Sequence, residues 1–277
     1  MSSPLRSWFL APSWAVAIAL LAAPMGIIIA YSLLTRGAYG GVMEPWTLEN
    51  YRRLFDPLYL AILWRSVWMA AVATVGCLLL GFPVALAVTR AGRWRNLLLY
   101  LVMLPFWTSF LVRTYAWMFL LRDTGLINTM LVGMGWISEP LPLLYNESAV
   151  IVGLVNGYLP FAVLPIFASL ERMDKHLLEA SADLGARPWE TMRHVVLPLC
   201  APGLRAASVL VFIPCLGAYL TPDLLGAGKA MMIGNLVQNQ FTTARDWPFG
   251  AALSLALMAA VMALVAGVLR KDQEAAL

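Results

Sequence analysis

Six apolar runs, each about as long as the hydrocarbon core of a bilayer is thick, limit what this chain can fold into. A helix needs about 20 apolar residues to cross that core. The runs cover residues 12–34, 66–89, 97–121, 148–170, 200–221 and 248–269. Only 12% of the 277 residues are charged, whereas soluble domains contain about a quarter. The sequence therefore predicts an all-α integral membrane protein with six transmembrane helices in a single domain, residues 1–277.

Basic residues between the runs predict the orientation of the chain. Lys and Arg are enriched on the cytoplasmic side of membrane proteins. They are more numerous in the loops that face inward when the N-terminus is cytoplasmic, and the densest group is Arg90, Arg93 and Arg95. With six spans, both termini are then cytoplasmic. A net charge of +4 spread over such loops does not make a phosphate-binding face, so we expect no nucleic-acid partner.

Several enzyme and cofactor classes lack their motifs here. Cys77, Cys200 and Cys215 lie in or beside apolar runs without CxxC spacing, which predicts neither a zinc site nor a disulfide framework. The two histidines, His176 and His194, are not at ligand spacing. Residues 224–230 resemble a phosphate-binding loop only loosely, because Ala230 stands where Ser or Thr should bind magnesium. We expect no catalytic residue, no metal site and no ATP bound by this chain.

The loop between the fourth and fifth runs, residues 171–199, is charged and has the pattern of a bent helix pair. Leu177, Leu178, Ala182 and Leu184 are spaced as one face of a short amphipathic helix. Gly185 suits a helix end, and a proline three residues later suits the first turn of another helix. The sequence predicts a helix–glycine–helix elbow that projects into the cytoplasm and offers a docking surface to a soluble partner.

The same loop resembles the EAA motif of binding-protein-dependent ABC importer permeases, E-A-A-x3-G-x9-I-x-L-P. Here the motif runs from Glu179 to Pro198, with mild replacements at the second Ala and at the Ile. The resemblance implies the fold of a type I ABC importer permease, in which this loop couples the membrane part to the ATPase. The coupling residues that it implies are Glu179, Ala180, Ser181, Asp183, Gly185, Leu197 and Pro198.

The resemblance also implies the partners and the chemistry they supply. It predicts a second permease subunit, most often a different, homologous chain. It further predicts two ATPase subunits that carry ATP and Mg, a periplasmic solute-binding protein and contact with membrane lipid. Transport would proceed by alternating access, driven by closure of the ATPase subunits against the loop 171–199.

A second resemblance concerns the third run and its exit, residues 104–128, which are similar to the spermidine/putrescine-type branch of these permeases. It implies a polyamine as the solute. The same importer class also serves other small solutes, so a ferric ion, an opine or another organic solute remains an alternative. A stand-alone secondary transporter is a further alternative, but the coupling carboxylates it would need inside the membrane are missing from the predicted spans.

Polar and aromatic residues on or near the third to fifth runs are candidates for the solute pathway. Aromatic faces attract ammonium groups, and an Arg inside a span requires a partner or water. Prolines at 83, 105, 160, 165 and 214 predict kinks that suit alternating access. The pathway candidates are Trp107, Arg113, Tyr115, Trp117, Asn156, Tyr219 and Asp223. Because no carboxylate lies at a predicted bilayer centre, we expect a low-affinity corridor, with selectivity set by the binding protein.

Overall fold

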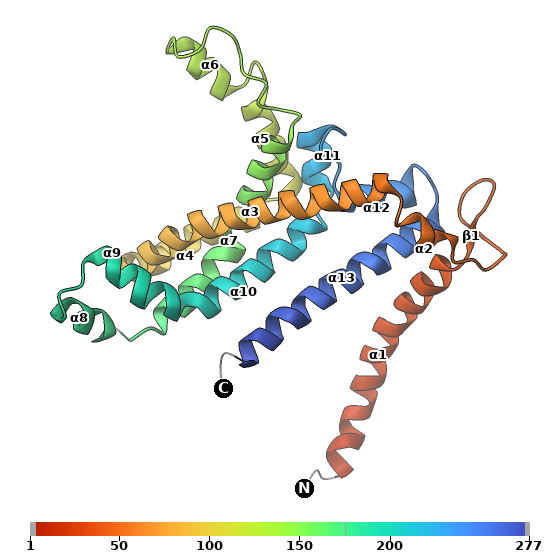
Figure 1. Cartoon of the computed structure of the whole chain (residues 1–277), viewed down its shortest axis with the longest axis horizontal. Coiled ribbons are helices and arrows are strands. Elements are labelled where there is room, and N and C mark those ends of the chain that lie inside the picture. The colour runs from red at the N-terminus through yellow and green to blue at the C-terminus, as the bar shows by residue number, and fades with distance from the viewer. Residues whose placement is uncertain (1–3, 175, 275–277) are drawn as a thin grey trace. The chain divides into compact units, whose positions relative to one another are not determined.

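The chain is almost entirely helical in its computed structural model, which describes residues 4–174 and 176–274 (Figure 1). Position 175 of the predicted coupling loop lies outside the described residues, as do the side chains of residues 12–15, 17, 268 and 269 in the first and last apolar runs. The longer helices are α1 (Pro4–Ser32), α3 (Pro57–Arg90), α7 (Glu147–Glu171), α10 (Leu197–Leu216) and α13 (Trp247–Glu274).

Shorter elements connect these helices. They are α2 (Glu49–Arg53), η1 (Gly92–Trp94), α4 (Arg95–Met103), η2 (Leu104–Trp107), α5 (Phe110–Leu121), α6 (Leu126–Gly133), α8 (His176–Asp183), α9 (Pro188–Thr191), the π-helix η3 (Met192–Val196), α11 (Leu220–Gly226) and α12 (Ile233–Thr242). A two-residue antiparallel ladder joins β1 (Thr35–Arg36) to β2 (Val42–Met43).

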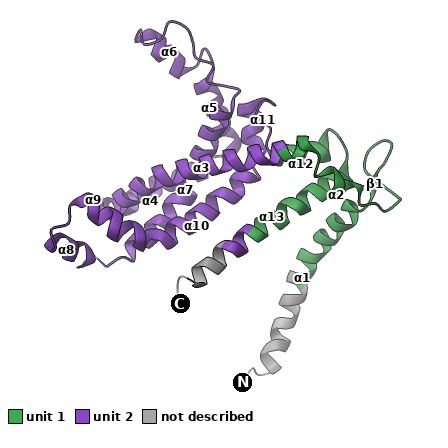
Figure 2. Cartoon of the chain, in the orientation of Figure 1, with its two compact units in different colours: residues 1–60, 236–263 green, residues 61–235, 264–277 purple. Residues whose placement is uncertain are grey.

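The chain divides into two compact units (Figure 2). Unit 1 comprises residues 1–60 and 236–263, and unit 2 comprises residues 61–235 and 264–277. The expectation of a single domain over residues 1–277 stays a prediction.

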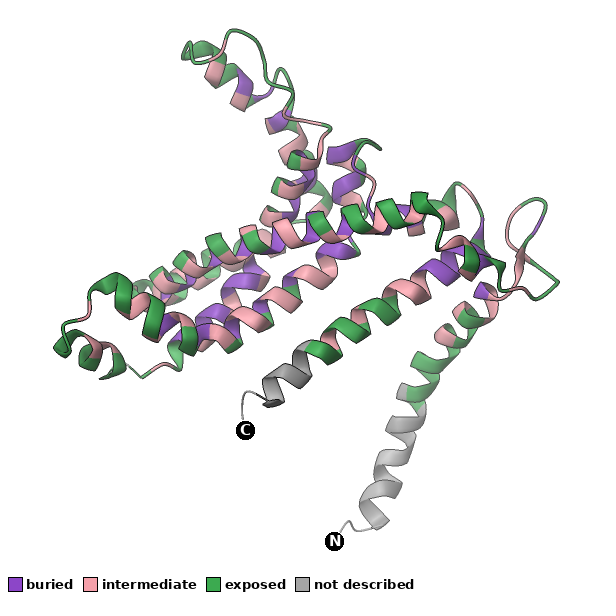
Figure 3. Cartoon of the chain, in the orientation of Figure 1, coloured by how far each residue is buried: buried purple, intermediate pink, exposed green. Residues whose placement is uncertain are grey.

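Four helical segments of the described chain are long and apolar enough to cross a membrane. They are Pro57–Arg90, Glu147–Glu171, Pro188–Leu216 and Trp247–Gly267, which contain most of the second, fourth, fifth and sixth predicted runs. A fifth span arises if the bent pair Gly92–Trp107 and Phe110–Gly133 counts as one. In the region of the first run, the apolar helix Ile18–Ser32 is shorter than a span among the residues searched. Large apolar side chains remain exposed along these helices (Figure 3), as is expected of surfaces that meet lipid or partner subunits.

The third run, predicted as one helix over residues 97–121, is broken, and its two halves are bent by 91°. The prediction of a continuous helix was wrong because the local sequence cannot sustain one. Pro105 has no backbone N–H and restricts the residue before it. Thr108 adopts an extended conformation, and both its N–H and its hydroxyl donate to the Pro105 carbonyl, at 3.2 and 2.8 Å. These bonds satisfy backbone groups that a continuous helix would have paired.

The fifth run was predicted to extend to residue 221, but α10 ends at Leu216. The chain then turns and begins the separate helix α11 at Leu220. A Cβ on Gly234 would lie only 2.5 Å from the carbonyl oxygens of Gly217 and Ala218. The returning chain therefore passes directly over the turn, which leaves no room for α10 to continue.

Small residues allow the helices of unit 2 to pack closely. A Cβ on Gly203 of α10 would lie 2.5 Å from the Ser169 Cβ and 2.8 Å from the Pro165 carbonyl oxygen of α7. Close approach of this kind is how helices gain contact area in lipid, where the hydrophobic effect does not drive them together. Helix α7 is accordingly the centre of unit 2, with Val150, Leu154, Val163 and Ile166 fully buried.

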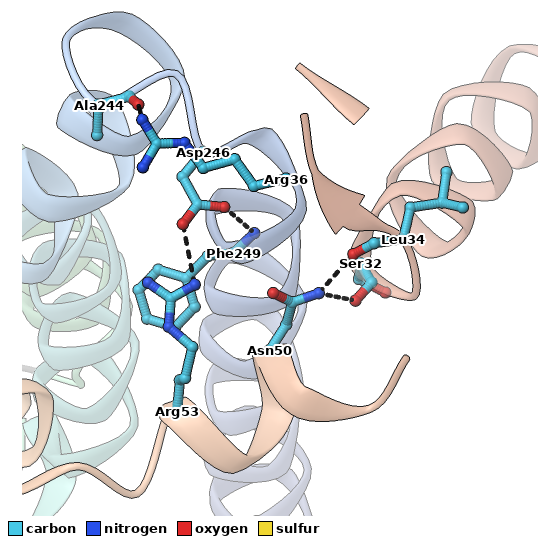
Figure 4. Close-up of polar contacts among 8 residues, drawn as sticks. All are labelled: Ser32, Leu34, Arg36, Asn50, Arg53, Ala244, Asp246 and Phe249. Carbon is cyan, nitrogen blue, oxygen red and sulfur yellow. Dashed lines mark hydrogen bonds and ion pairs between the residues drawn. The ribbon is translucent and has the colours of Figure 1, made fainter. Parts of the chain in front are cut away.

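Polar contacts hold unit 1 together (Figure 4). The Asn50 amide donates to the carbonyl oxygens of Ser32 and Leu34 at the end of α1, at 3.0 and 2.8 Å. The buried carboxylate of Asp246 accepts 2.9 Å from Arg53 Nη1 and caps α13 by accepting from the Phe249 N–H. The Arg53 guanidinium also lies 4.1 Å from the centre of the Phe249 ring. These bonds fix the short helix α2 between the ends of α1 and α13.

We predict that Asp246→Asn destabilises unit 1 by about 1–3 kcal/mol, because Arg53 loses its ionic partner while the cap on α13 is kept. The Arg53 side chain is 39% exposed, so solvent places the effect toward the lower end of this range. Thermal unfolding of the purified subunit in detergent, followed by Trp fluorescence, measures the change. Glu49→Gln is the matched control, since Glu49 is an exposed acid of the same unit; equal unfolding temperatures for both variants would contradict the assignment.

Candidate functional site: an elbow and an interrupted helix group

The predicted elbow is present as two short helices that follow α7. Asp174 Oδ1 accepts from the His176 N–H at 3.0 Å and so caps the start of α8. On the first turn of α8, His176 Nδ1 lies 3.2 Å from Glu179 Oε2. Both side chains are exposed. Glu179 is therefore placed on the outer surface of α8, where another protein can reach it.

Gly185 ends α8 as predicted. Its φ of +80° lies in the left-handed region, which favours glycine. The Gly185 N–H donates to Ala182 O at 2.9 Å, and the Ala186 N–H donates to Ser181 O at 3.1 Å. This pair of bonds is the Schellman motif, which satisfies the last carbonyls of a helix. The turn is thus defined by backbone geometry and does not depend on a partner protein.

Helix α9 leads the chain into η3 and α10. Pro188 occupies its first turn, and the Arg187 N–H donates 2.7 Å to Glu190 Oε2. The Ser181 hydroxyl lies 2.8 Å from the Thr191 hydroxyl and links α8 to α9. At the tip, Leu184 is 89% exposed and Trp189 is 68% exposed. Two large, exposed apolar side chains on a pair of helices held together by hydrogen bonds are typical of a protein-docking surface.

The junction of the elbow with α10 is a π-helix, which the sequence analysis did not predict. Residues 192–196 adopt this wider turn immediately before Leu197 and Pro198. Pro198 has no N–H to donate to the carbonyl four residues earlier, so the regular ladder cannot continue. Such π turns occur often at functional sites. A groove of about 620 Å³ lies beside it, between α7, α8 and α10, and its lining includes Ser169, Arg172, Leu177 and Pro202.

The pathway candidates of the third run lie on both sides of the break between η2 and α5. Trp107, the last residue of η2, is 84% exposed. Tyr115 is exposed on α5, and Trp117 is half-buried. The Arg113 guanidinium carbon lies 5.6 Å from the centre of the Phe106 ring and 5.5 Å from that of Phe110.

The remaining pathway candidates lie on α7 and α11 or next to them. Asn156 is exposed on α7, and Tyr219 and Asp223 are exposed at the start of α11. Helices α5, α7 and α11 pack against one another in unit 2. Helices α5 and α11 contact the N-terminal half of α7, at Gly157 and Gly153, and the elbow follows the other end of α7 (Figure 1). Among the described residues, no side-chain hydrogen bond, ion pair or ring contact joins one candidate to another.

Side chains that the sequence analysis did not single out hold α11 and α12 in place. Asn235 Nδ2 donates 2.6 Å to the Tyr219 carbonyl, and the Ile233 N–H donates 2.7 Å to the Ser66 hydroxyl. Thr221 is 1% exposed, and its hydroxyl has no partner among the described residues. In the sequence, Ser66 and Asn235 are recognisable only as polar residues in or beside apolar stretches. The sequence does not indicate their bonding partners, because these lie far away along the chain. In the described part of the chain, no group of three His, Cys, Asp or Glu residues forms a metal site.

The sequence of this chain is similar to those of known transport permeases. Residues 77–274 match the family described as binding-protein-dependent transport system inner membrane component. The spermidine/putrescine transport system permease protein PotB of Haemophilus influenzae is 41% identical over 254 residues, which cover 91% of this chain and 88% of the relative. PotB of Escherichia coli is 43% identical over 235 residues, which cover 84% of this chain and 86% of the relative.

A solved structure shares the fold. It is that of a bacterial alginate ABC transporter in complex with an alginate pentasaccharide-bound periplasmic protein. The TM-score is 0.76 at 16% sequence identity, and the alignment covers 95% of this chain and 93% of the other. At this identity the likeness concerns the fold alone.

We predict that Gly185→Val loosens the elbow, whereas Gly185→Asn does not. A β-branched residue with a φ of +80° costs about 1–2 kcal/mol, while Asn tolerates the left-handed region. Amide hydrogen exchange of residues 176–191 should accelerate about tenfold in the Val variant, as expected for a local loss of about 1.4 kcal/mol. Wild-type exchange in the Val variant would show that the turn does not limit the stability of the elbow.

Proposed function

Since the chain belongs to the family of binding-protein-dependent transport system inner membrane components, we propose that it is one of two permease subunits of an ABC importer for spermidine or putrescine. The observation that carries the solute assignment is the sequence identity of 41–43% to PotB across most of the chain. The chain itself is a transport subunit of the inner membrane and not an enzyme, in keeping with its relatives.

The proposed arrangement in the membrane has six spans with both termini in the cytoplasm. Four helices and the bent pair provide five of these spans, and α1 provides the first. This orientation places the elbow, residues 176–191, in the cytoplasm and α11 toward the outer side. It is supported by the basic cluster Arg90, Arg93 and Arg95, of which Arg95 forms an ion pair with Glu171 at the end of α7.

The elbow is proposed to be the contact with an ATPase subunit. Leu184 and Trp189 offer apolar anchors at its tip, and Glu179 offers a charge that a basic residue of the ATPase would pair with. The Schellman turn and the bond between Ser181 and Thr191 keep α8 and α9 together. Helices α8 and α9 would therefore move together when the ATPase pushes on the elbow, and this movement would pass into η3 and α10. Closure of two ATPase subunits would in this way change the angle of α10 against α7.

ATP and Mg are proposed to bind to the ATPase subunits alone, and a separate periplasmic binding protein is proposed to deliver the solute. The corridor through this subunit would pass Trp107, Tyr115, Trp117, Asn156, Tyr219 and Asp223. Aromatic faces would hold ammonium groups weakly, and the Asp223 carboxylate would attract them at the outer end. Weak, successive contacts suit passage better than a single tight site.

We predict that Glu179→Arg lowers copurification of the ATPase with the permease pair at least about tenfold, because like charges then face each other in the interface. ATP-driven uptake of spermidine into proteoliposomes should fall in parallel. The matched control is Glu139→Arg, the same change at an exposed acid in a loop on the proposed outer side. If Glu179→Arg left assembly and uptake intact, the coupling role of the elbow would be wrong.

The corridor is tested by replacing Trp107, Trp117, Tyr219 and Asp223 one at a time with Ala. At least one replacement should lower the maximal rate of polyamine uptake about threefold or more, as expected from the loss of one cation–π or ionic contact. The apparent affinity set by the binding protein should stay the same. Unchanged uptake in all four variants would remove the corridor from these helices and leave the importer assignment untouched.

A further inference from the structure

Among the described residues the guanidinium of Arg113 has no ion pair with a carboxylate, and we infer that it pairs with a carboxylate of the second permease subunit. The inference rests on the proposed function, which supplies that subunit. It assigns Arg113, one of the pathway candidates, to the contact between the two permeases.

Part of the Arg113 guanidinium is buried without a hydrogen bond among the described residues. Its Nε and Nη1 atoms are buried and have no hydrogen-bond partner among the described residues. The rings of Phe106 and Phe110, 5.6 and 5.5 Å from the guanidinium carbon, are the aromatic groups that contact it. Cation–π contacts offset part of the loss of water, but an Arg inside a membrane normally also pairs with an acid or a carbonyl.

Other arginines of the described chain do have such partners. Arg53 pairs with Asp246, Arg65 with Glu147 and Arg95 with Glu171. Arg36 donates to the Ala244 carbonyl at 2.7 Å. These four lie near the ends of the long helices or in loops, where water could also have solvated them. Arg113 lies in the bent pair that can form a span, where the need for a partner is greatest.

The position of Arg113 in α5 makes an anion still more necessary. The helix begins at Phe110, so the Arg lies close to its N-terminal end. The N-terminus of a helix carries a partial positive charge, and a cation placed there is disfavoured. An anion near Arg113 would therefore be attracted both by the guanidinium and by the end of α5.

The surface beside Arg113 fits a second protein. Val112, Tyr115, Ala116 and Phe119 are exposed at positions i, i+3, i+4 and i+7 of α5, which form one face of the helix. Arg113 borders this face. A helix of the second permease packed on it would bring a side chain to the guanidinium. A carboxylate is the group that matches the planar fork of Arg.

Two other anions fit less well. The contacts with Phe106 and Phe110 direct the guanidinium toward the start of α5, which in the proposed orientation is away from the lipid phosphates of the outer leaflet. The proposed solute is a cation and would be repelled by an unpaired Arg. A carboxylate of the second subunit removes this repulsion and leaves the corridor open to ammonium groups.

The test uses the complete importer, with an affinity tag on this chain, and compares Arg113→Met with the control Arg122→Met. Both arginines are on or next to α5 and lie over a Phe ring at 5.5–5.6 Å, but Arg122 is exposed. Arg113→Met should lower recovery of the second permease at least about tenfold, because a buried carboxylate is left without its partner. Arg122→Met should leave recovery unchanged, and Arg113→Lys should restore most of it.

The carboxylate is identified by changing each Asp and Glu in the spans of the second permease to Asn or Gln, alone and together with Arg113→Met. One amide should reproduce the defect alone and relieve it in the double variant, which demonstrates direct coupling. Normal recovery of Arg113→Met, or a defect that no amide relieves, would overturn the inference. A defect that changes only with the phosphatidylglycerol content of the membrane would also overturn it and indicate a lipid. Spermidine uptake by the wild-type complex tests the proposed function separately.

Discussion

Backbone hydrogen bonding without water is the constraint on which the rest of this structure depends. Inside a bilayer each N–H and C=O group must be paired within the protein, which favours uninterrupted helices. The chain nevertheless interrupts its helices at Thr108, at Gly217 and at the π-helix before Leu197. At Thr108 the freed groups bond back to Pro105. At the turn after α10, the Tyr219 carbonyl is bonded by Asn235. These interruptions persist because specific groups satisfy them.

The interruptions separate parts of the chain to which the proposed function gives different tasks. The elbow at one end of α7 is a self-contained motif whose turn is fixed by the φ of Gly185 and by bonds between α8 and α9. At the other end, α11 packs on α7 through Gly153, where a Cβ would lie 2.6 Å from Leu225. Helix α10 connects the two ends and carries prolines at its start and near its end. A rigid handle, a long helix and a packed return segment together can convert a push into a change of access.

Charged side chains of this protein are subject to the same constraint as its backbone groups. Where water is absent, a charged side chain needs a partner as surely as a carbonyl does. Asp246 has Arg53. Burial of that guanidinium by itself lowers its pKa, but the hydrogen bonds and charges of Asp246 and Tyr59 together outweigh the burial, so the pKa of Arg53 is raised. Among the described residues, Arg113 has only the rings of Phe106 and Phe110. The buried carboxylate of unit 1 thus has its cation within the same chain, whereas Arg113 of α5 is the charge for which we infer a partner in another chain.

The sequence by itself determined the membrane class, the approximate position of the long helices and the elbow, because hydropathy, glycine and proline act over a few neighbouring residues. It also singled out Arg113 as a charge in an apolar run. It did not determine that the third run bends by 91°, that α10 stops at Leu216 or that Asn235 and Ser66 hold the return segment. These features depend on close approach and on bonds between residues far apart in the chain. Only the tertiary structure decided them, since local propensity contains no information about which distant group will satisfy a broken helix.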